Sequence, residues 1–149
     1  MKFEIPYPLK VEHEELHAEL AEAIEAGGII GQAAKGVATV LHPHFLKEEE
    51  FAIPPLALLS ALAQGQIRPE MREVLTMTNK LKAELARMLE EHRAIVDALD
   101  ILSGAARKEK EMKYVRFAEK LILHAKNEEE VLYPAAILVG EYLKLRLND

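Results

Sequence analysis

The chain has 149 residues, half of them hydrophobic, and a formal net charge of −6. This length and apolar content predict one globular domain over residues 1–149 with a core of its own. The acidic balance, without a basic stripe, argues against a nucleic-acid partner, and the absence of cysteine excludes disulfides, thiolate metal ligands and cysteine nucleophiles.

The first predicted element is a helix that begins at Leu9 and ends at the Gly27-Gly28 pair. Apolar residues recur along it at spacings of three and four, as on one face of a helix. His13 and His17 fall on this apolar face. Both imidazoles are therefore expected to point toward the interior.

A second helix is predicted over residues 29–53. Its inward stripe contains His44 and Glu48. His42, Glu49 and Glu50 lie off that stripe and are expected to face solvent. Pro43 lies within this helix, where a proline removes one backbone hydrogen bond and costs on the order of 3 kcal/mol. We therefore expect a kink or bulge just before His44.

The second half of the chain repeats this arrangement after a short extra helix, apolar on nearly all sides, within residues 56–63. A third long helix is predicted over residues 69–102, with His92 on its inward stripe, and Ser103-Gly104 is expected to end it. The fourth helix extends to about Leu147 and should bend at Pro134. Its inward face carries two polar residues, His124 and Glu128. Glu129 and Glu130 are expected on a solvated face, and Tyr133 is expected to pack.

These elements predict an all-α protein. No stretch alternates apolar and polar residues between hairpin turns, so no strand is expected. Short connections at Gly27-Gly28 and Ser103-Gly104 favour an antiparallel up-down four-helix bundle. The short apolar helix is expected between the second and third long helices.

No segment resembles a membrane span or a secretion signal. The longest uncharged run, residues 51–67, contains two prolines and falls short of the roughly 20 apolar residues that a span requires. The first residues lack an apolar stretch of signal-peptide length. With the cysteine-free composition, this predicts a cytoplasmic protein without a membrane partner.

One motif occurs twice, 80 positions apart. Each copy has a His, a Glu four residues later and a Pro ten residues later: His44, Glu48 and Pro54 in the first, and His124, Glu128 and Pro134 in the second. A Glu-His pair also occurs twice, as Glu12-His13 and Glu91-His92. The sequence therefore predicts that each half of the chain supplies half of one site and that the two halves meet.

A spacing of four residues places two helical side chains on one face, so the His and the Glu of each copy can reach one point. Imidazole and carboxylate ligands suit iron, manganese or zinc better than calcium. Four His and two Glu are enough for two metal ions. Each Glu could bridge the pair, two His could complete each ion, and some positions would stay open for a small ligand.

The order His13, His44-x-x-x-Glu48, His92, His124-x-x-x-Glu128, with Phe45 after the second His and a Pro after each Glu cluster, resembles the hemerythrin or HHE cation-binding family. The resemblance covers nearly the whole chain. It implies a four-helix bundle that holds two non-haem iron ions joined by two carboxylates and an oxo or hydroxo group. It also implies that the six named His and Glu residues are the ligands, with Glu48 and Glu128 bridging.

The chain departs from the oxygen-carrying members of that family, which use five His. Met88 and Val96 occupy the inward positions beside His92 where a fifth His would lie. His17, one turn after His13, is the available substitute, and its role as a ligand stays open against a role in packing. The departure puts reversible oxygen carriage in doubt.

Three functions follow from these patterns. The first is a di-iron protein that binds or senses dioxygen, nitric oxide or peroxide, or handles iron; the second is a di-iron enzyme acting on peroxide or nitric oxide. A zinc peptidase is the third, because His13-Glu14-Glu15-Leu16-His17 matches the His-Glu-x-x-His signature. That motif would leave both His-x-x-x-Glu copies without a role, so binding or sensing is the favoured prediction. A homo-oligomer is compatible with all three.

Overall fold

The computed structural model describes residues 3–148, and these are almost entirely helical, with no strand. The long helices are α1 (Tyr7–Glu25), α2 (Gly28–Lys47), α4 (Val74–Lys108), α5 (Met112–Asn127) and α6 (Tyr133–Arg146). Short helical segments connect or extend them: π-helical turns at Glu48–Ala52 and Glu128–Leu132, 3₁₀ helices at Pro54–Leu58 and Pro69–Glu73, and α3 (Leu59–Ala63).

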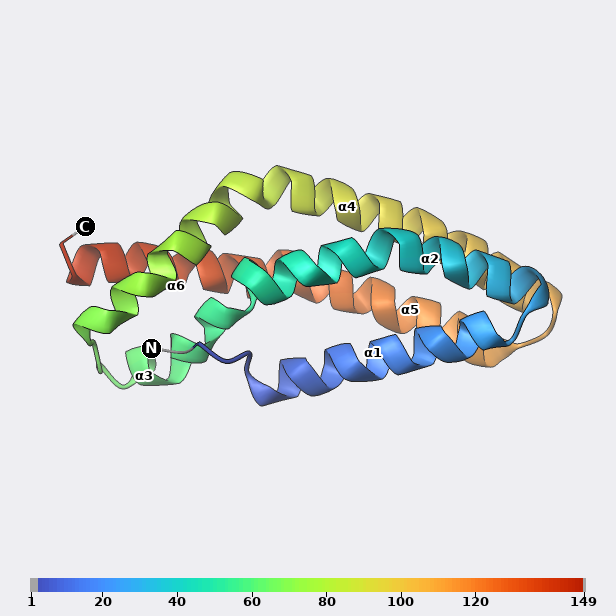
Figure 1. Ribbon diagram of the computed structural model, residues 1–149, viewed down its shortest axis with the longest axis horizontal. Helices are drawn as coiled ribbons and strands as arrows, with labels where there is room; N and C mark the ends of the chain where they lie inside the picture. Colours follow the sequence, from blue (N-terminus) through green and yellow to red (C-terminus); the bar gives the residue numbers. More distant parts are fainter. Residues whose placement is uncertain (1–2, 149) are drawn as a thin grey trace.

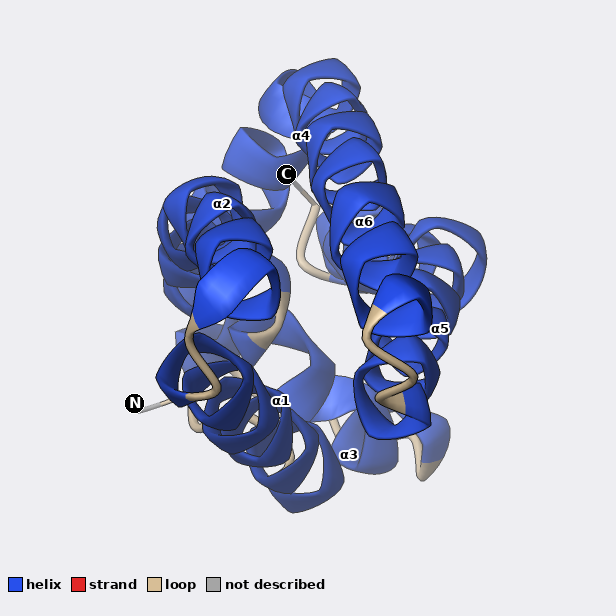
Figure 2. Cartoon of the chain, turned by 90° about the vertical axis from the view of Figure 1, so that its right-hand side faces the viewer, coloured by secondary structure: helices blue, strands red, loops and turns tan. Residues whose placement is uncertain are grey.

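The long helices form four rods that run side by side along the long axis of the molecule (Figures 1 and 2). α1, α2 and α4 form three of the rods, and α5 continued by α6 forms the fourth. Successive rods run in opposite directions, and both ends of the chain lie at the same end of the bundle (Figure 1). The predicted antiparallel four-helix bundle is confirmed, as is the short extra helix, which appears as the 3₁₀ segment and α3.

The two tight connections at the far end of the bundle differ from each other. Gly27 and Gly28 have φ values of 68° and 58°, a region that favours glycine, and they separate α1 from α2 as predicted. The predicted stop at Ser103-Gly104 is wrong, because α4 continues to Lys108. A glycine inside a helix costs only about 1 kcal/mol, and burial of Ala106 in the following turn favours continuation of the helix.

α4 ends at Lys108 through its backbone. Lys110 has a φ of 59°, and its N–H donates to the carbonyl of Arg107 over 3.1 Å. The N–H of Glu111 donates to the carbonyl of Ala106 over 2.8 Å. This pair of hydrogen bonds is the Schellman arrangement that often ends helices, here with a lysine in the usual glycine position.

The irregularity predicted before His44 lies after it instead. α2 passes through Pro43 as an α-helix, and the π-helical turn begins at Glu48. The N–H of Ile53 donates to the Glu48 carbonyl over 2.9 Å, and the N–H of Tyr133 donates to the Glu128 carbonyl in the equivalent turn. Each π turn precedes a proline, whose ring would clash with the carbonyl four residues earlier in a regular α-helix. In a π turn the backbone hydrogen bond spans five residues, so the widened turn accommodates the proline that follows it.

The bundle interior contains two main apolar clusters. One lies toward the tight turns and includes Leu20, Leu41 and Leu99. The other lies toward the chain ends and includes Leu81 and Met88. The buried polar residues described below lie on the helical turns between these two clusters. Within residues 3–148, no helix is both long and apolar enough to cross a lipid bilayer.

Candidate metal centre

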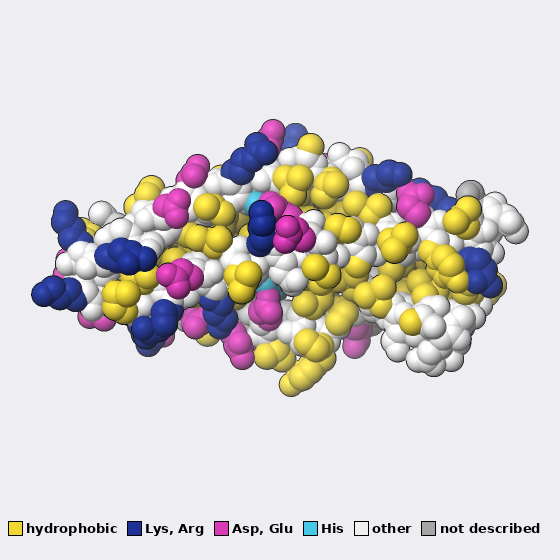
Figure 3. Space-filling model, turned by 180° about the vertical axis from the view of Figure 1, so that it is seen from behind, with side chains coloured by type: hydrophobic (Ala, Val, Ile, Leu, Met, Phe, Trp, Pro, Cys, Tyr) yellow, Lys and Arg dark blue, Asp and Glu magenta, His cyan; other side chains and the backbone are white. Residues whose placement is uncertain are grey.

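Each of the four rods contributes one buried histidine to the middle of the bundle: His13 from α1, His44 from α2, His92 from α4 and His124 from α5. Glu48 and Glu128 are the first residues of the two π turns, and their side chains are 0% and 1% exposed. Six polar residues that were selected by helical periodicity are therefore all inside. Only small parts of histidine side chains are visible on the face drawn in Figure 3.

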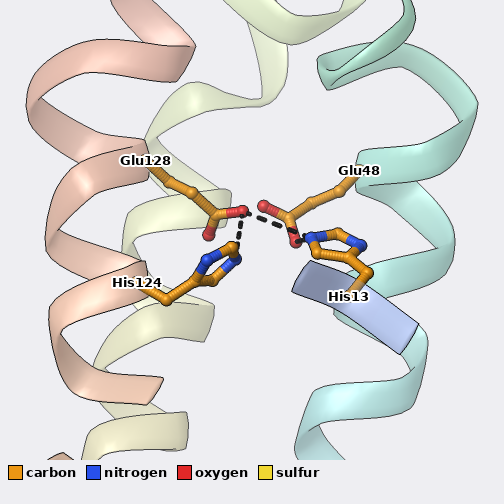
Figure 4. Close-up of side chains that lie close together, drawn as sticks. All are labelled: His13, Glu48, His124 and Glu128. Carbon is orange, nitrogen blue, oxygen red and sulfur yellow. Dashed lines mark ion pairs between the residues drawn. The ribbon is translucent and has the colours of Figure 1, made fainter. Parts of the chain in front are cut away.

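The six residues form two groups that share both carboxylates. One group is His13, His124, Glu48 and Glu128, and the other is His44, His92, Glu48 and Glu128. In each group, the ligand atoms lie within 4.8 Å of one another. Figure 4 shows the first group, in which Glu48 and Glu128 extend toward each other from opposite sides.

The oxygens of each carboxylate are divided between the two groups. Glu128 places Oε2 3.1 Å from Nε2 of His124 and Oε1 3.1 Å from Nε2 of His92. Glu48 places Oε1 3.8 Å from Nε2 of His13 and Oε2 3.6 Å from Nε2 of His44. Each glutamate thus offers one oxygen to each group, which is the arrangement that a bridging carboxylate requires.

Unsatisfied polar atoms indicate that the cluster fits a cation. Four buried atoms among the described residues have no hydrogen-bond partner: Nε2 of His13, Nε2 of His124, Oε1 of Glu48 and Oε2 of Glu128. Such atoms cost free energy when they are buried without a partner. They are the two histidine Nε2 atoms of the first group and the carboxylate oxygens that face them, so they converge on one region. A metal ion with nitrogen and oxygen ligands would satisfy them together.

Comparison with known proteins identifies the family. The sequence model of the hemerythrin HHE cation-binding domain matches residues 5–136. The chain belongs to the hemerythrin HHE cation-binding family. Searches of curated proteins and of solved structures gave no match. The predicted resemblance is confirmed, and with the buried His/Glu cluster it indicates that this HHE domain binds metal.

The HHE domain holds each imidazole from its outer side as well. Nδ1 of His44 donates to Glu91 over 2.9 Å, and Nδ1 of His92 donates to Glu129 over 3.0 Å. His124 pairs with Glu12 in the same way, and Nδ1 of His13 lies 3.6 Å from Glu49. An imidazole that donates Nδ1–H outward keeps its Nε2 lone pair for a metal. All four Nε2 atoms face the shared carboxylates.

Two of these outer partners were expected on a solvated face. The side chain of Glu129 is only 30% exposed and binds His92, so it belongs to the site. Glu49 is 42% exposed but its carboxylate still faces His13. The expectation holds for Glu50, which pairs with Lys80 at the surface over 3.1 Å. The doubled sequence contained the missed signal, because Glu49 and Glu129 are themselves 80 positions apart.

The crowding of charges changes the pKa values inside the HHE domain. Burial and the adjacent Glu128 raise the pKa of Glu48 to about 7. Burial alone would lower the pKa of His124, but the Glu128 and Glu48 carboxylates raise it to about 9. Although burial raises the pKa of Glu128, contacts with Glu48 and the imidazoles hold it well below its usual range. Without a metal, the cluster therefore retains protons at neutral pH.

Tyr133 is the residue that periodicity did not select, since its expected role was packing. Its hydroxyl donates to Oε2 of Glu48 over 2.7 Å and lies 3.1 Å from Nε2 of His44 and 3.2 Å from Nε2 of His92. The side chain is almost fully buried. Burial beside the carboxylates raises the pKa of the phenol, which therefore stays protonated in the absence of metal.

His17 is placed differently from the other candidates. It is half-buried, belongs to neither ligand group among the described residues, and stacks on His42 with ring centroids 5.2 Å apart. Glu14 is exposed. The His-Glu-x-x-His match therefore does not gather its two imidazoles into one of the clusters that can hold an ion.

Proposed function

We propose that this HHE protein binds two iron ions and uses an open coordination position to bind or sense a small ligand such as dioxygen, nitric oxide or peroxide. The proposed ligands are those that the sequence predicted: His13, His44, Glu48, His92, His124 and Glu128. One observation carries the proposal, namely that both glutamates offer one oxygen to each of two His pairs. Bound iron would supply the open position and the capacity for redox chemistry.

The surroundings of the site favour a small ligand. His13, His44, His92 and His124 are at most 6% exposed. The two apolar clusters flank the site, so a large polar substrate would lose its hydration on entry. Diatomic molecules and peroxide are small enough to enter through side-chain motion. Manganese or zinc would fit the same nitrogen and oxygen ligands.

Metal content is the direct test of this proposal. Purified protein titrated anaerobically with ferrous iron should bind two equivalents per chain. Glu128→Ala removes one oxygen from each group and should abolish stable binding at both positions. Glu130→Ala is the matched control, because Glu130 is exposed and lies two residues away, so it should bind as the wild type does. Wild-type protein that bound no metal, or one zinc ion that Glu128→Ala retained, would contradict the proposal.

The reaction of the ferrous protein separates binding from turnover. Stopped-flow mixing with oxygen, nitric oxide or peroxide should give a stable adduct if the protein carries or senses the ligand. Repeated consumption of the ligand would identify an enzyme that uses the same residues. Irreversible oxidation of the iron would indicate iron handling.

A further inference from the structure

The two copies of the repeat differ at the buried position that closes each π turn. The residue five positions after the repeated glutamate is Ile53 in the first copy and Tyr133 in the second. Each is 1% exposed, and each closes its π turn through the backbone hydrogen bond to that glutamate. The two halves of the site therefore share a backbone geometry at this turn but carry different side chains at its last position.

The Tyr133 hydroxyl lies among the donor atoms of one group only. It is 2.7 Å from Oε2 of Glu48 and 3.1–3.2 Å from Nε2 of His44 and His92. These are three of the atoms that the His44/His92 group turns toward a common ion. An oxygen at these distances from all three is placed to share that ion with them.

The other group lacks such an oxygen. Among the described residues, the four buried atoms without a hydrogen-bond partner are Nε2 of His13 and of His124 and the carboxylate oxygens that face them. The Tyr133 hydroxyl contacts none of these four atoms. The face of the His13 ring is covered by Phe45, with centroids 4.2 Å apart and planes within 5°. Ile53 carries no polar atom. The two metal positions are therefore inequivalent in the protein itself.

We propose that Tyr133 is a further protein ligand, whose phenolate oxygen binds the ion held by His44 and His92. This inference rests on the proposed function. On binding, the O–H bond breaks, the oxygen–metal bond forms and the proton leaves to solvent, as happens to other acidic ligands of metals. One ion then has five protein donors and the other has four. The exogenous ligand accordingly binds the ion held by His13 and His124.

Ferric protein provides a readout that does not depend on activity. Phenolate bound to iron(III) gives a visible charge-transfer band and phenolate vibrations in resonance Raman spectra. We expect both in the iron-loaded wild type. Tyr133→Phe should lose them while it keeps two iron ions per chain. Tyr114→Phe is the matched control, because Tyr114 is partly buried against the apolar cluster near the tight turns. Removal of the Tyr114 hydroxyl should leave the charge-transfer band unchanged.

Azide binding tests the assignment of the open position. Azide is a small anion that occupies vacant sites on ferric iron. The wild type should bind one azide for each pair of iron ions, and Tyr133→Phe should bind two, because the second ion gains a vacancy. The Tyr114→Phe control should still bind one.

Failure of this inference can be told from failure of the proposed function. Protein that binds two iron ions but shows no phenolate vibrations in the wild type overturns the role of Tyr133 alone. Protein that binds no iron overturns the function itself. The wild-type Raman spectrum decides the question even if Tyr133→Phe does not fold. Phenolate vibrations that persist in Tyr133→Phe would also overturn the assignment.

Discussion

Oε1 of Glu91 lies 2.9 Å from Nδ1 of His44, although the two residues are 47 positions apart and belong to different helices. Glu91 is adjacent in sequence to His92, yet it binds the histidine of the other half. Glu12 behaves alike: it precedes His13 and binds His124. Each Glu-His pair of the repeat thus provides one inward imidazole and one carboxylate that orients another imidazole.

Glu91→Gln should weaken metal binding without changing its stoichiometry. The amide cannot carry the negative charge that strengthens the His44 imidazole as a ligand, and loss of such a partner typically lowers affinity about 10–100-fold. Chelator competition with ferrous iron measures the change. Glu90→Gln is the control, because Glu90 immediately precedes Glu91 on α4 and is exposed. Equal affinities for the two variants would show that Glu91 does not act through His44.

Metal removal should lower the melting temperature. The metal-free cluster contains buried atoms without partners, and a ligand at about 100 times its Kd stabilises the folded state by roughly 2.7 kcal/mol. For a chain of this size, that corresponds to a shift of about 5–10 °C. Differential scanning calorimetry with and without chelator measures it. Glu128→Ala protein should melt at the same temperature in both conditions.

Metal affinity should rise with pH. The metal-free protein holds protons on His124, with a pKa of about 9, and on Glu48, with a pKa of about 7. A metal ion must displace both protons. Affinity should therefore increase between about pH 6 and 9, by about tenfold per pH unit where one proton is released. An affinity that is constant over this range would mean that the cluster is not protonated as described.

The stability of the metal-free protein should change with pH in the opposite direction. The folded pKa values of His124 and Glu48 lie above the ordinary pKa values of 6.5 for His and 4.5 for Glu, so the folded state binds more protons than the unfolded state between each pair of values. The free energy of unfolding therefore falls as pH rises from about 4.5 to about 9. Urea unfolding at several pH values, with chelator present, tests the sign.

His17→Ala should retain the metal. His17 lies outside both ligand groups and stacks on His42 near the surface. Two metal equivalents should remain, as they should in Glu14→Gln, whose carboxylate is exposed. Loss of one equivalent in His17→Ala would instead make His17 a ligand, and would require α1 to rotate toward the site.

Gly140→Ala should destabilise the bundle. A Cβ at Gly140 would lie 2.2 Å from Oγ1 and 2.6 Å from Cβ of Thr78 on α4, so the two helices would have to separate. Overpacking of this kind costs about 1–3 kcal/mol. Gly104→Ala is the contrasting control, because a Cβ there meets no atom within 4 Å. That substitution should stabilise by about 0.5–1 kcal/mol. Thermal melts of both variants measure the difference in sign.

Much of the fold was predictable because helical periodicity determines which side chains face inward. The same periodicity selected His44 over His42 and Glu48 over Glu49 as inward-facing residues, and both choices agree with burial. Periodicity failed where a backbone hydrogen bond or a packing contact determines where a helix ends. The end of α4 depends on packing of Ala106, which a Ser-Gly pair does not reveal.

The chemistry around the six central residues was harder to predict. A carboxylate such as Glu129 lies off the apolar stripe, yet its length lets it reach inward to His92. Tyr133 is also off the regular stripe, because the π turn before it adds a residue and rotates the following positions. Periodicity assumes uniform helical geometry, so it cannot place a side chain that follows such a turn.

The sharing of donors between helices has a consequence for how the molecule opens. α1 with α2 forms one helical hairpin and α4 with α5 forms another, and each proposed ion takes one histidine and one glutamate from each hairpin. Bound metal would therefore cross-link the hairpins twice at the same level. Amide hydrogens on all four rods near the site should then exchange in a single concerted event when metal is bound.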